Sequence, residues 1–181
     1  MGLDMYLTKK TYVKQWSHQK PEEQFEVVVK KGGVTYPNIN PSKVSNVEEE
    51  VMYWRKFNAL HLWFVENVQG GEDNCQTSYV DTEVLAQLVE TLRKVKDSLE
   101  RSPKGKRHVV SGYSGGKEMF TEIEVFEDTS VAEELLPTTS GFFFGGTEYG
   151  EYYLECVNET LEVLEKELEI PCDGYYYHAS W

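Results

Sequence analysis

The chain has 181 residues, of which 40% are hydrophobic and 27% charged, a composition that predicts one globular domain with a substantial core. Its 18 basic and 31 acidic side chains give a net charge of −13. This balance argues against ordinary nucleic-acid binding, which requires a basic face. Residues 127–173 carry 13 acidic and one basic side chain, against 18 and 17 in residues 1–126. That uneven distribution is compatible with a basic protein partner, or with mimicry of the charge of a nucleic acid.

The sequence also limits the compartment and the kinds of site. No apolar run is long enough to cross a bilayer, and the start MGLDMYLTKK lacks the basic and apolar regions of a secretory signal. Its sixth residue, Tyr6, departs from the myristoylation pattern. Three well-separated cysteines (Cys75, Cys156 and Cys172) and four scattered histidines indicate neither a disulfide framework nor a metal site. We therefore expect a cytoplasmic protein with no metal and no cofactor.

The N-terminal third contains a predicted strand and a predicted hairpin. Residues 2–8 alternate loosely between apolar and polar and predict a strand that carries Asp4. Asp4 is either an exposed carboxylate on an edge strand or the partner of Arg55 or Lys56. Residues 24–36 contain a β-branched run, a Gly-Gly turn and a second short run, which together predict a β-hairpin.

Residues 46–69 predict one long helix, around which the rest of the chain is organised. Asn46 would cap the helix, and the three glutamates that follow suit the positive end of its dipole. At about 100° per residue, the apolar residues share one broad arc, and Asn58 and His61 fall inside it. The apolar members of the arc are Val47, Val51, Trp54, Phe57, Leu60, Phe64, Val65 and Val68.

Two polar side chains that point inward must find partners, because an unpaired buried donor or acceptor costs about 1–3 kcal/mol. In one interpretation, neighbouring backbone satisfies Asn58 and His61 in an ordinary core helix. In the other, Trp54, Arg55, Asn58 and His61 form one wall of a ligand pocket.

The middle of the chain predicts a second helix and a second hairpin. Gly70 and Gly71 end the first helix, and residues 82–99 carry a clear amphipathic stripe. Residues 107–113 and 117–126 alternate around a Ser-Gly-Gly turn and predict a β-hairpin. The whole 103–127 segment is a possible peripheral insertion.

The last third predicts a third long helix. Residues 131–137 predict a short helical turn that Pro137 ends, and the triplet 142–144 between glycines predicts a short strand. Thr147 would cap a helix that ends near Glu169. The acidic side of that helix is either a solvated face or a docking surface for a basic partner. Its members are Glu148, Glu151, Glu155, Glu159, Glu162 and Glu169. We expect the aromatic tail, residues 172–181, to fold back on the core or to mediate association.

Together these elements predict the α+β class. We expect one domain over residues 1–181, with three long helices packed on an antiparallel or mixed sheet built from hairpins.

Two candidate sites of chemistry are weaker than they first look. The Gly145-Gly146-Thr147 turn before the third helix resembles a phosphate-binding turn, but Glu148 would repel an anion there. His61 with a carboxylate such as Asp4 or Glu148 would form a general acid–base pair. No serine or cysteine lies in a recognisable nucleophile context, so binding is expected rather than catalysis.

Aromatic side chains combined with a few cationic and amide groups make the best case for a function. Aromatic faces stack on bases, a guanidinium makes forked contacts to phosphate, and amide and imidazole groups pair with base edges and hydroxyls. We therefore expect a small nucleotide-derived ligand rather than a polymer. The candidate ligand-binding residues are Asp4, Trp54, Arg55, Asn58, His61, Phe143, Glu148, Tyr149 and Tyr152.

Three stretches also carry a family resemblance: the start MGLDMYL, the segment VMYWRKFNALHLWFVENVQ and the segment LLPTTSGFFFGGTEYGEYY. They resemble a family of small, largely uncharacterised proteins from phages and prophages, over most of the chain except the 103–127 region. The resemblance implies a phage protein expressed in a bacterial host, where such proteins often counter host defence. Some of them sequester nucleotide signals made by host immune enzymes.

The leading hypothesis is therefore a phage anti-defence protein in the host cytoplasm that captures a cyclic ADP-ribose isomer or a cyclic oligonucleotide. One alternative is an acidic inhibitor that binds a host defence protein by mimicking nucleic-acid charge. Another is a hydrolase of such a signal that depends on His61. Neither a membrane nor direct DNA binding is expected, and a homo-oligomer remains open.

Overall fold

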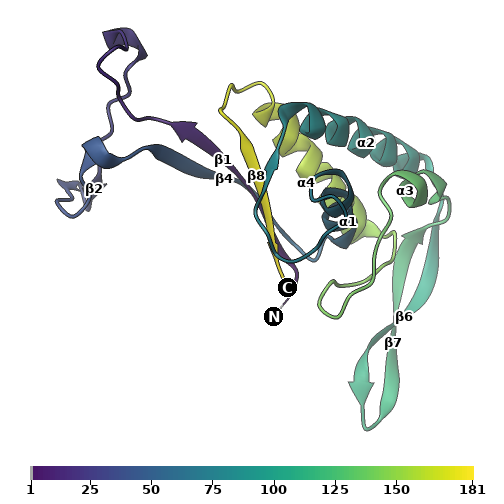
Figure 1. Ribbon diagram of the computed structural model, residues 1–181. Coiled ribbons are helices and arrows are strands. Elements are labelled where there is room, and N and C mark those ends of the chain that lie inside the picture. Colours follow the sequence, from purple (N-terminus) through teal and green to yellow (C-terminus); the bar gives the residue numbers. More distant parts are fainter. Residues whose placement is uncertain (1) are drawn as a thin grey trace.

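The computed structural model describes residues 2–181, apart from the side chains of residues 111 and 113. Its centre is a four-stranded antiparallel sheet, and three helices lie on one side of that sheet (Figure 1). In spatial order the strands are β4 (Asn46–Arg55), β1 (Asp4–Tyr12), β8 (Tyr175–Ser180) and β5 (Ser78–Val80). The helices are α1 (Asn58–Asn67), α2 (Thr82–Arg101) and α4 (Glu151–Glu167), with a short α3 (Ser130–Leu135) nearby. The predicted α+β class is confirmed.

The prediction that the sheet is built from hairpins is wrong. Strand β1 pairs with β4 and β8, which follow it in sequence at very different distances, and β8 comes from the end of the chain. Among the described residues, the two hairpins form separate two-stranded ribbons outside this sheet. They are β2 (Lys30–Lys31) with β3 (Val34–Thr35), and β6 (Lys104–Ser114) with β7 (Lys117–Phe126). The aromatic tail therefore folds back into the centre of the sheet.

The predicted helix over residues 46–69 is wrong in its first half. Residues Asn46–Arg55 form strand β4, and helix α1 begins only at Asn58. Between them Lys56 has a φ of 59°, a left-handed conformation that ends the strand and redirects the chain into the helix. A conformation that non-glycine residues rarely adopt leaves no periodic signal in the sequence.

The glutamates expected at the start of that helix are members of strand β4 instead. Glu48 pairs with Lys10 of β1 at 3.2 Å, and Glu49 pairs with Lys9 at 3.7 Å. Opposite charges on paired strands stabilise the pairing, and here they join residues 38 and 40 positions apart in sequence. The glutamates therefore serve a non-local contact that a helical interpretation of 46–55 does not contain.

The region before α4 also differs from expectation. Residues 142–144 form a turn rather than a strand, since the amide of Phe144 donates to the carbonyl oxygen of Gly141 at 3.2 Å. The third helix begins at Glu151 and not at Thr147. Helix α2, the β6–β7 hairpin and the short α3 lie close to their predicted positions.

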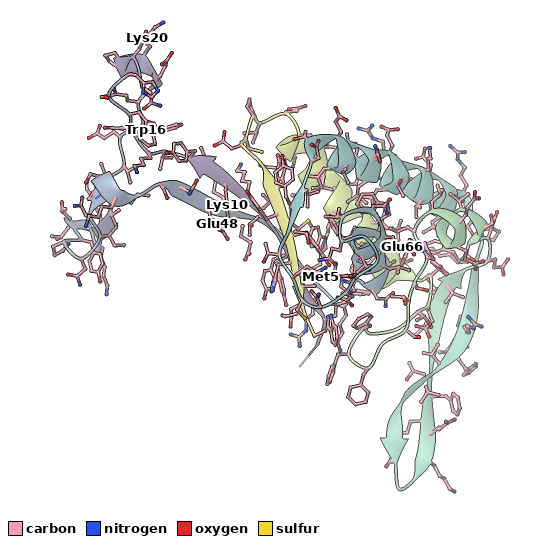
Figure 2. The ribbon with its side chains drawn as sticks, viewed as in Figure 1. Met5, Lys10, Trp16, Lys20, Glu48 and Glu66 are labelled. Atoms are coloured by element: carbon pink, nitrogen blue, oxygen red, sulfur yellow. The ribbon has the colours of Figure 1, made fainter. Side chains whose placement is uncertain are left out.

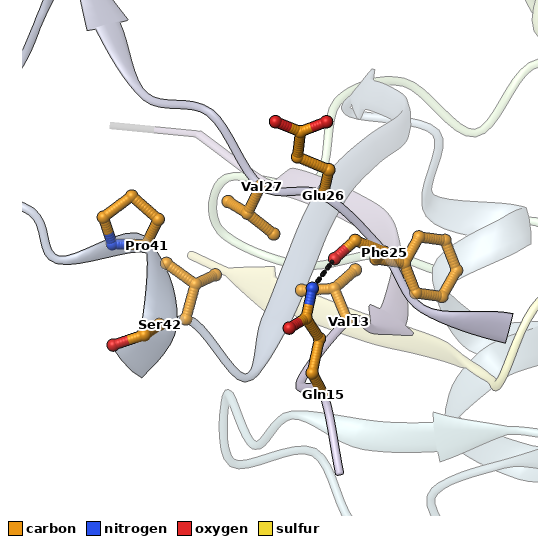
Figure 3. Close-up of a pocket in the computed structure, with 8 residues that line it drawn as sticks. Val13, Gln15, Phe25, Glu26, Val27, Pro41 and Ser42 are labelled. Carbon is orange, nitrogen blue, oxygen red and sulfur yellow. Dashed lines mark hydrogen bonds between the residues drawn. The ribbon is translucent and has the colours of Figure 1, made fainter. Parts of the chain in front are cut away.

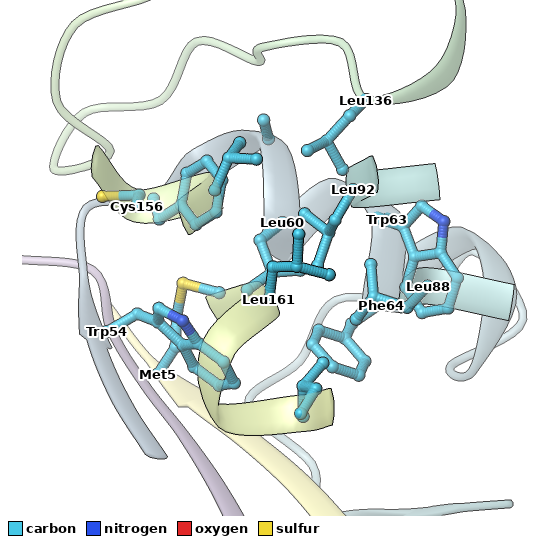
Figure 4. Packing of buried hydrophobic residues seen from close by; sticks show 14 of the residues in the cluster. Met5, Trp54, Leu60, Trp63, Phe64, Leu88, Leu92, Leu136, Cys156 and Leu161 are labelled. Atoms are coloured by element: carbon cyan, nitrogen blue, oxygen red, sulfur yellow. The ribbon is translucent and has the colours of Figure 1, made fainter. Parts of the chain in front are cut away.

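The core lies between the sheet and the helices. Helix α1 is buried on almost every side, as a helix with apolar residues around most of its circumference must be. Figure 4 shows Met5 of β1 and Trp54 of β4 facing Leu60 of α1 and Leu161 of α4. Leu88 and Leu92 bring the apolar stripe of α2 into the same cluster.

Two projections leave this body. Strands β1 and β4 extend beyond the sheet as a two-stranded ribbon, and residues 13–45, which connect the far ends of these two strands, are called the arm. The β6–β7 hairpin projects in a different direction (Figure 1). Within residues 2–181, no helix combines the length and the apolar character that a membrane crossing requires.

Candidate functional site

Two residues of the predicted pocket wall, Trp54 and Asn58, are committed to the interior. The indole nitrogen of Trp54 donates to the hydroxyl of Thr160 at 2.7 Å. The amide nitrogen of Asn58 donates to the carbonyl oxygens of Phe144 and Gly146, at 3.1 and 2.7 Å. Its amide oxygen accepts from the backbone of Thr139 at 3.0 Å. Asn58 therefore holds the loop of residues 137–150 by three bonds to main chain.

His61 is also fully paired and only 1% exposed. Its Nε2 lies 3.0 Å from the carboxylate of Asp73, and its Nδ1 lies 2.8 Å from the hydroxyl of Tyr177. Burial raises the pKa of Tyr177, so this phenol keeps its proton. Both ring nitrogens of His61 are therefore engaged within the protein. A general base must reach the proton that it abstracts, and the burial of His61 excludes this in the conformation described.

The opposite wall of the predicted pocket is spread over several places. Phe143 lies in the loop turn against Phe142, with ring centroids 4.6 Å apart, and the hydroxyl of Tyr149 accepts from the backbone of Thr138 at 3.1 Å. Tyr152 is exposed on the first turn of α4. Tyr152 meets the first wall at Arg55, because its hydroxyl donates to the carbonyl oxygen of that residue, while these contacts of Phe143 and Tyr149 lie within the loop.

Glu148 and Tyr152 line a different cavity, of about 400 Å³, between β7 and the start of α4. Glu124 and Glu151 also line it. Three carboxylates around one hollow disfavour a phosphate. The expected repulsion of an anion at this glycine-rich turn therefore agrees with the geometry.

Asp4 and Arg55 are brought together as expected, and they lie on the face of the sheet that no helix covers. The Nε of Arg55 lies 4.0 Å from a carboxylate oxygen of Asp4. The hydroxyl of Tyr53 donates to the same carboxylate, which raises the pKa of Tyr53. Tyr53 thus connects the Asp4–Arg55 pair to a larger group of aromatic side chains.

That group, which we call the tyrosine face, occupies the open side of the sheet. It consists of Tyr6, Tyr53, Tyr79, Tyr176 and His178. Tyr6 of β1 lies opposite Tyr53 of β4, with ring centroids 5.2 Å apart, and opposite His178 of β8, at 6.1 Å. In the neighbouring row on the same face, two residues earlier along β8, Tyr79 of β5 lies opposite Tyr176 of β8, with ring centroids 5.7 Å apart. The four strands together present one aromatic band.

The tyrosine face is accessible and has a cation at each end. Tyr53 and Tyr79 are 42% and 54% exposed. Arg55 lies at one end, and the ammonium of Lys10 lies 4.5 Å from the ring centroid of Tyr176 at the other. Figure 2 shows Lys10 beside Glu48, where the ribbon leaves the body. Each cation also has an acidic neighbour, so the local charge is mixed.

The comparisons with known proteins identify no relative. No protein-family model matches the chain, and neither a curated protein nor a solved structure matches it. Among the described residues, no group of three or more histidine, cysteine, aspartate or glutamate side chains is arranged to hold a metal ion. The site therefore has to be assigned from its own geometry.

The sequence interpretation missed the tyrosine face, although a signal for it exists. In the tail YYYHAS, alternate residues point to opposite sides of a strand, which separates Tyr176 and His178 from Tyr175 and Tyr177. Treating residues 46–55 as a strand would likewise have placed Tyr53 and Arg55 on one face. The pairing of these strands with one another has no local signal.

Proposed function

We propose that this protein is a binding protein that captures a small, ring-containing and phosphate-containing ligand on the tyrosine face. In an infected bacterium, the ligand would be a nucleotide-derived immune signal such as a cyclic ADP-ribose isomer or a cyclic oligonucleotide. The observation that carries the proposal is the pair of neighbouring rows of aromatic side chains on the uncovered side of the sheet. The phage and immune context comes from the resemblance of the sequence motifs.

The chemistry of the face suits such a ligand. Stacking of a base on an aromatic side chain contributes about 1–3 kcal/mol per base and tolerates every base. Arg55 presents a planar guanidinium, with its side chain 60% exposed, that can make forked contacts to a phosphate. The hydroxyls of exposed tyrosines and the imidazole of His178 add hydrogen-bonding groups at the ring edges.

The proposed site keeps Asp4 and Arg55 from the sequence-based set and leaves out the three interior residues. Trp54, Asn58 and His61 have their polar groups paired within the protein, so a ligand would have to break those bonds to reach them. Their role in this proposal is to hold the helices against the back of the sheet.

Calorimetry against a panel of cyclic mononucleotides, cyclic dinucleotides and cyclic ADP-ribose isomers tests the proposal. We expect at least one compound to bind more tightly than about 1 mM. Tyr53→Ala or Tyr79→Ala should weaken that binding by about 5- to 100-fold, because each removes one stacking surface. Both residues lie on edge strands and are exposed, so the fold should tolerate their loss.

Phe120→Ala is the matched control, since Phe120 is an exposed aromatic residue on the β6–β7 hairpin, away from the sheet. It should leave binding unchanged. Mass spectrometry of the ligand after incubation should recover it intact, whereas a cleaved product would favour the hydrolase alternative. No binding across the panel would overturn the proposal.

A further inference from the structure

The arm has little internal structure to explain its apolar surface. Its secondary structure consists of two short 3₁₀ turns and the four paired residues of β2 and β3. Trp16, Phe25, Val28, Val34 and Ile39 are all exposed, Val34 at 72%. Figure 2 shows Trp16 and Lys20 far from the helices. Exposed apolar side chains gathered on one projection are typical of a surface that meets a partner.

The arm also differs from the rest of the chain in charge. Residues 13–45 contain five lysines and three glutamates, a net charge of +2 in a protein of net charge −13. Within the described part of the chain, none of these five lysines forms an ion pair, whereas eight of the thirteen other lysines and arginines do. The arm therefore carries cations without acidic partners among the described residues, although Lys14 lies 4.9 Å from the ring centroid of Trp16 and Lys31 lies 5.9 Å from that of Tyr36.

A cavity of about 290 Å³ lies within the arm, between the segments 13–15, 25–27 and 41–44 (Figure 3). Val13, Phe25, Val27, Pro41 and Val44 form the apolar part of its lining, and Gln15, Glu26 and Ser42 form the polar part. Lys14 and Lys43 are exposed and adjoin lining residues in the sequence. A hollow with an apolar part and two exposed lysines beside it suits a partner surface that combines apolar and acidic side chains.

The complementary surface is present on the same molecule. Helix α4 contains six glutamates and one lysine. Glu155 and Glu159 are exposed one helical turn apart and form no ion pair within the described residues. Tyr152, on the preceding turn, adds an exposed aromatic side chain to the same helix. Acidic groups without basic partners beside an aromatic ring match the lysines without acidic partners and the cavity of the arm.

We infer that the protein forms a symmetric dimer in which the arm of each copy docks on helix α4 of the other. A twofold axis makes both contacts at once, because each copy supplies one arm and one helix. A second copy is the occupant that the charges favour, since the basic arm and the acidic helix belong to one chain. The tyrosine face lies on the opposite side of the sheet from α4, and the two surfaces meet where the hydroxyl of Tyr152 donates to the carbonyl oxygen of Arg55.

Two charge-reversed variants test this dimer, with the oligomeric state measured by sedimentation and light scattering. Lys14→Glu/Lys43→Glu and Glu155→Lys/Glu159→Lys should each raise the dissociation constant of the dimer about tenfold or more, because like charges then face each other. An equimolar mixture of the two variants should restore the dimer. In a mixed pair, the acidic arm meets the basic helix and the basic arm meets the acidic helix.

Lys94→Glu/Arg101→Glu on α2 is the control, because these exposed cations form no ion pair within the described residues and the variant changes the net charge by the same amount as the arm variant. It should dimerise like the unmodified chain. A chain that stays monomeric to about 1 mM would overturn the inference, as would a dimer that both reversals leave unchanged. A monomer whose arm lysines bind duplex DNA or another acidic protein would also overturn it and reassign the arm to that partner.

Discussion

Tyr176 and Tyr177 are neighbours on strand β8, but the alternation of the strand places them in opposite environments. Tyr177 is fully buried, stacks on Phe64 with ring centroids 4.0 Å apart, and shares a hydrogen bond of 2.8 Å with Nδ1 of His61. Tyr176 lies on the open side of the sheet beside Tyr79, with Lys10 above its ring. The same residue type therefore belongs to the core in one position and to a surface in the next.

The two faces of the whole sheet repeat this division. Inward residues such as Met5, Leu7 and Ala179 are fully buried, and the residues at outward positions are half-buried or exposed. A one-residue shift of register would exchange the two sets, so the buried face fixes which tyrosines remain available for recognition. Stability and binding are thereby assigned to alternate residues of the same strands.

Truncating the two tyrosines in turn should separate these roles, and this is the largest effect that we predict. Tyr177→Ala should lower the free energy of unfolding by about 3–5 kcal/mol, because it empties a core site and leaves His61 without one partner. Tyr176→Ala should cost less than about 1 kcal/mol. Urea unfolding followed by circular dichroism measures both, and equal losses would contradict the division of the sheet into two faces.

Helix α2 and the β6–β7 hairpin could be predicted because their signals are local. The stripe of Leu85, Leu88, Leu92 and Leu99 repeats at helical spacing, with Asp81 as an N-cap that accepts from the backbone of Glu83. The hairpin alternates around a tight glycine turn, so its strands pair with their neighbours in sequence. Such elements need no information from the rest of the chain.

Strand β4 could not be predicted in the same way. Val47, Val51 and Trp54 have spacings that fit one face of a helix, and only pairing with β1 makes the segment a strand. Part of the ambiguity is physical, because the register shifts between Leu7 and Thr8 and breaks the simple alternation opposite them. A contact between distant segments overrode the local pattern.

The candidate site shows the same limit. That Asn58 and His61 point inward could be predicted, and both do. Their partners could not, because Phe144, Gly146 and Tyr177 lie 86, 88 and 116 residues away from them in sequence. A polar side chain that points inward either lines a pocket or forms hydrogen bonds within the core. Only the position of backbone far away in sequence distinguishes the two cases.

Asn58→Ala should therefore behave as a structural defect on the covered side of the sheet. It removes three hydrogen bonds to the 137–150 loop, and the two carbonyl oxygens and one amide left behind should cost about 3 kcal/mol in unfolding free energy. Protease digestion should begin in this loop, with ligand binding on the tyrosine face reduced less than twofold. A variant that lost binding while keeping its stability would return Asn58 to the ligand site.

Lys9 is the charged member of the inward face, and it gives a pH-dependent test. Its ammonium donates to Glu167 at 2.6 Å, and this hydrogen bond raises the pKa of Lys9. Because the folded pKa lies above the unfolded value of about 10.4, the contribution is complete below that pH and is lost as pH rises through the folded pKa. Glu167→Gln should cost about 1–2 kcal/mol at pH 7.

The difference between the unmodified protein and Glu167→Gln should shrink as the pH rises above about 10.4 in denaturant titrations. Glu162→Gln is a suitable control, because the Glu162–Lys166 pair is exposed and should contribute little to stability. A difference that stayed constant up to pH 11.5 or so would show that the loss comes from packing and not from the charge on Lys9.

The smallest effect on stability should come from the largest deletion. No α-helix of the described chain packs on the arm, so deleting residues 13–45 should remove little of the core. Tyr12 and Asn46 lie opposite each other in register, so an Asn-Gly turn can join them in place of residues 13–45. The shortened chain should keep its unfolding free energy to within about 1 kcal/mol, because the buried cluster lies almost wholly outside the arm.

The shortened chain should also be monomeric and still bind its ligand on the tyrosine face. Loss of cooperative unfolding in this variant would show that the arm contributes to the core. The division into a buried and an open face would then hold only for the part of the sheet before Tyr12.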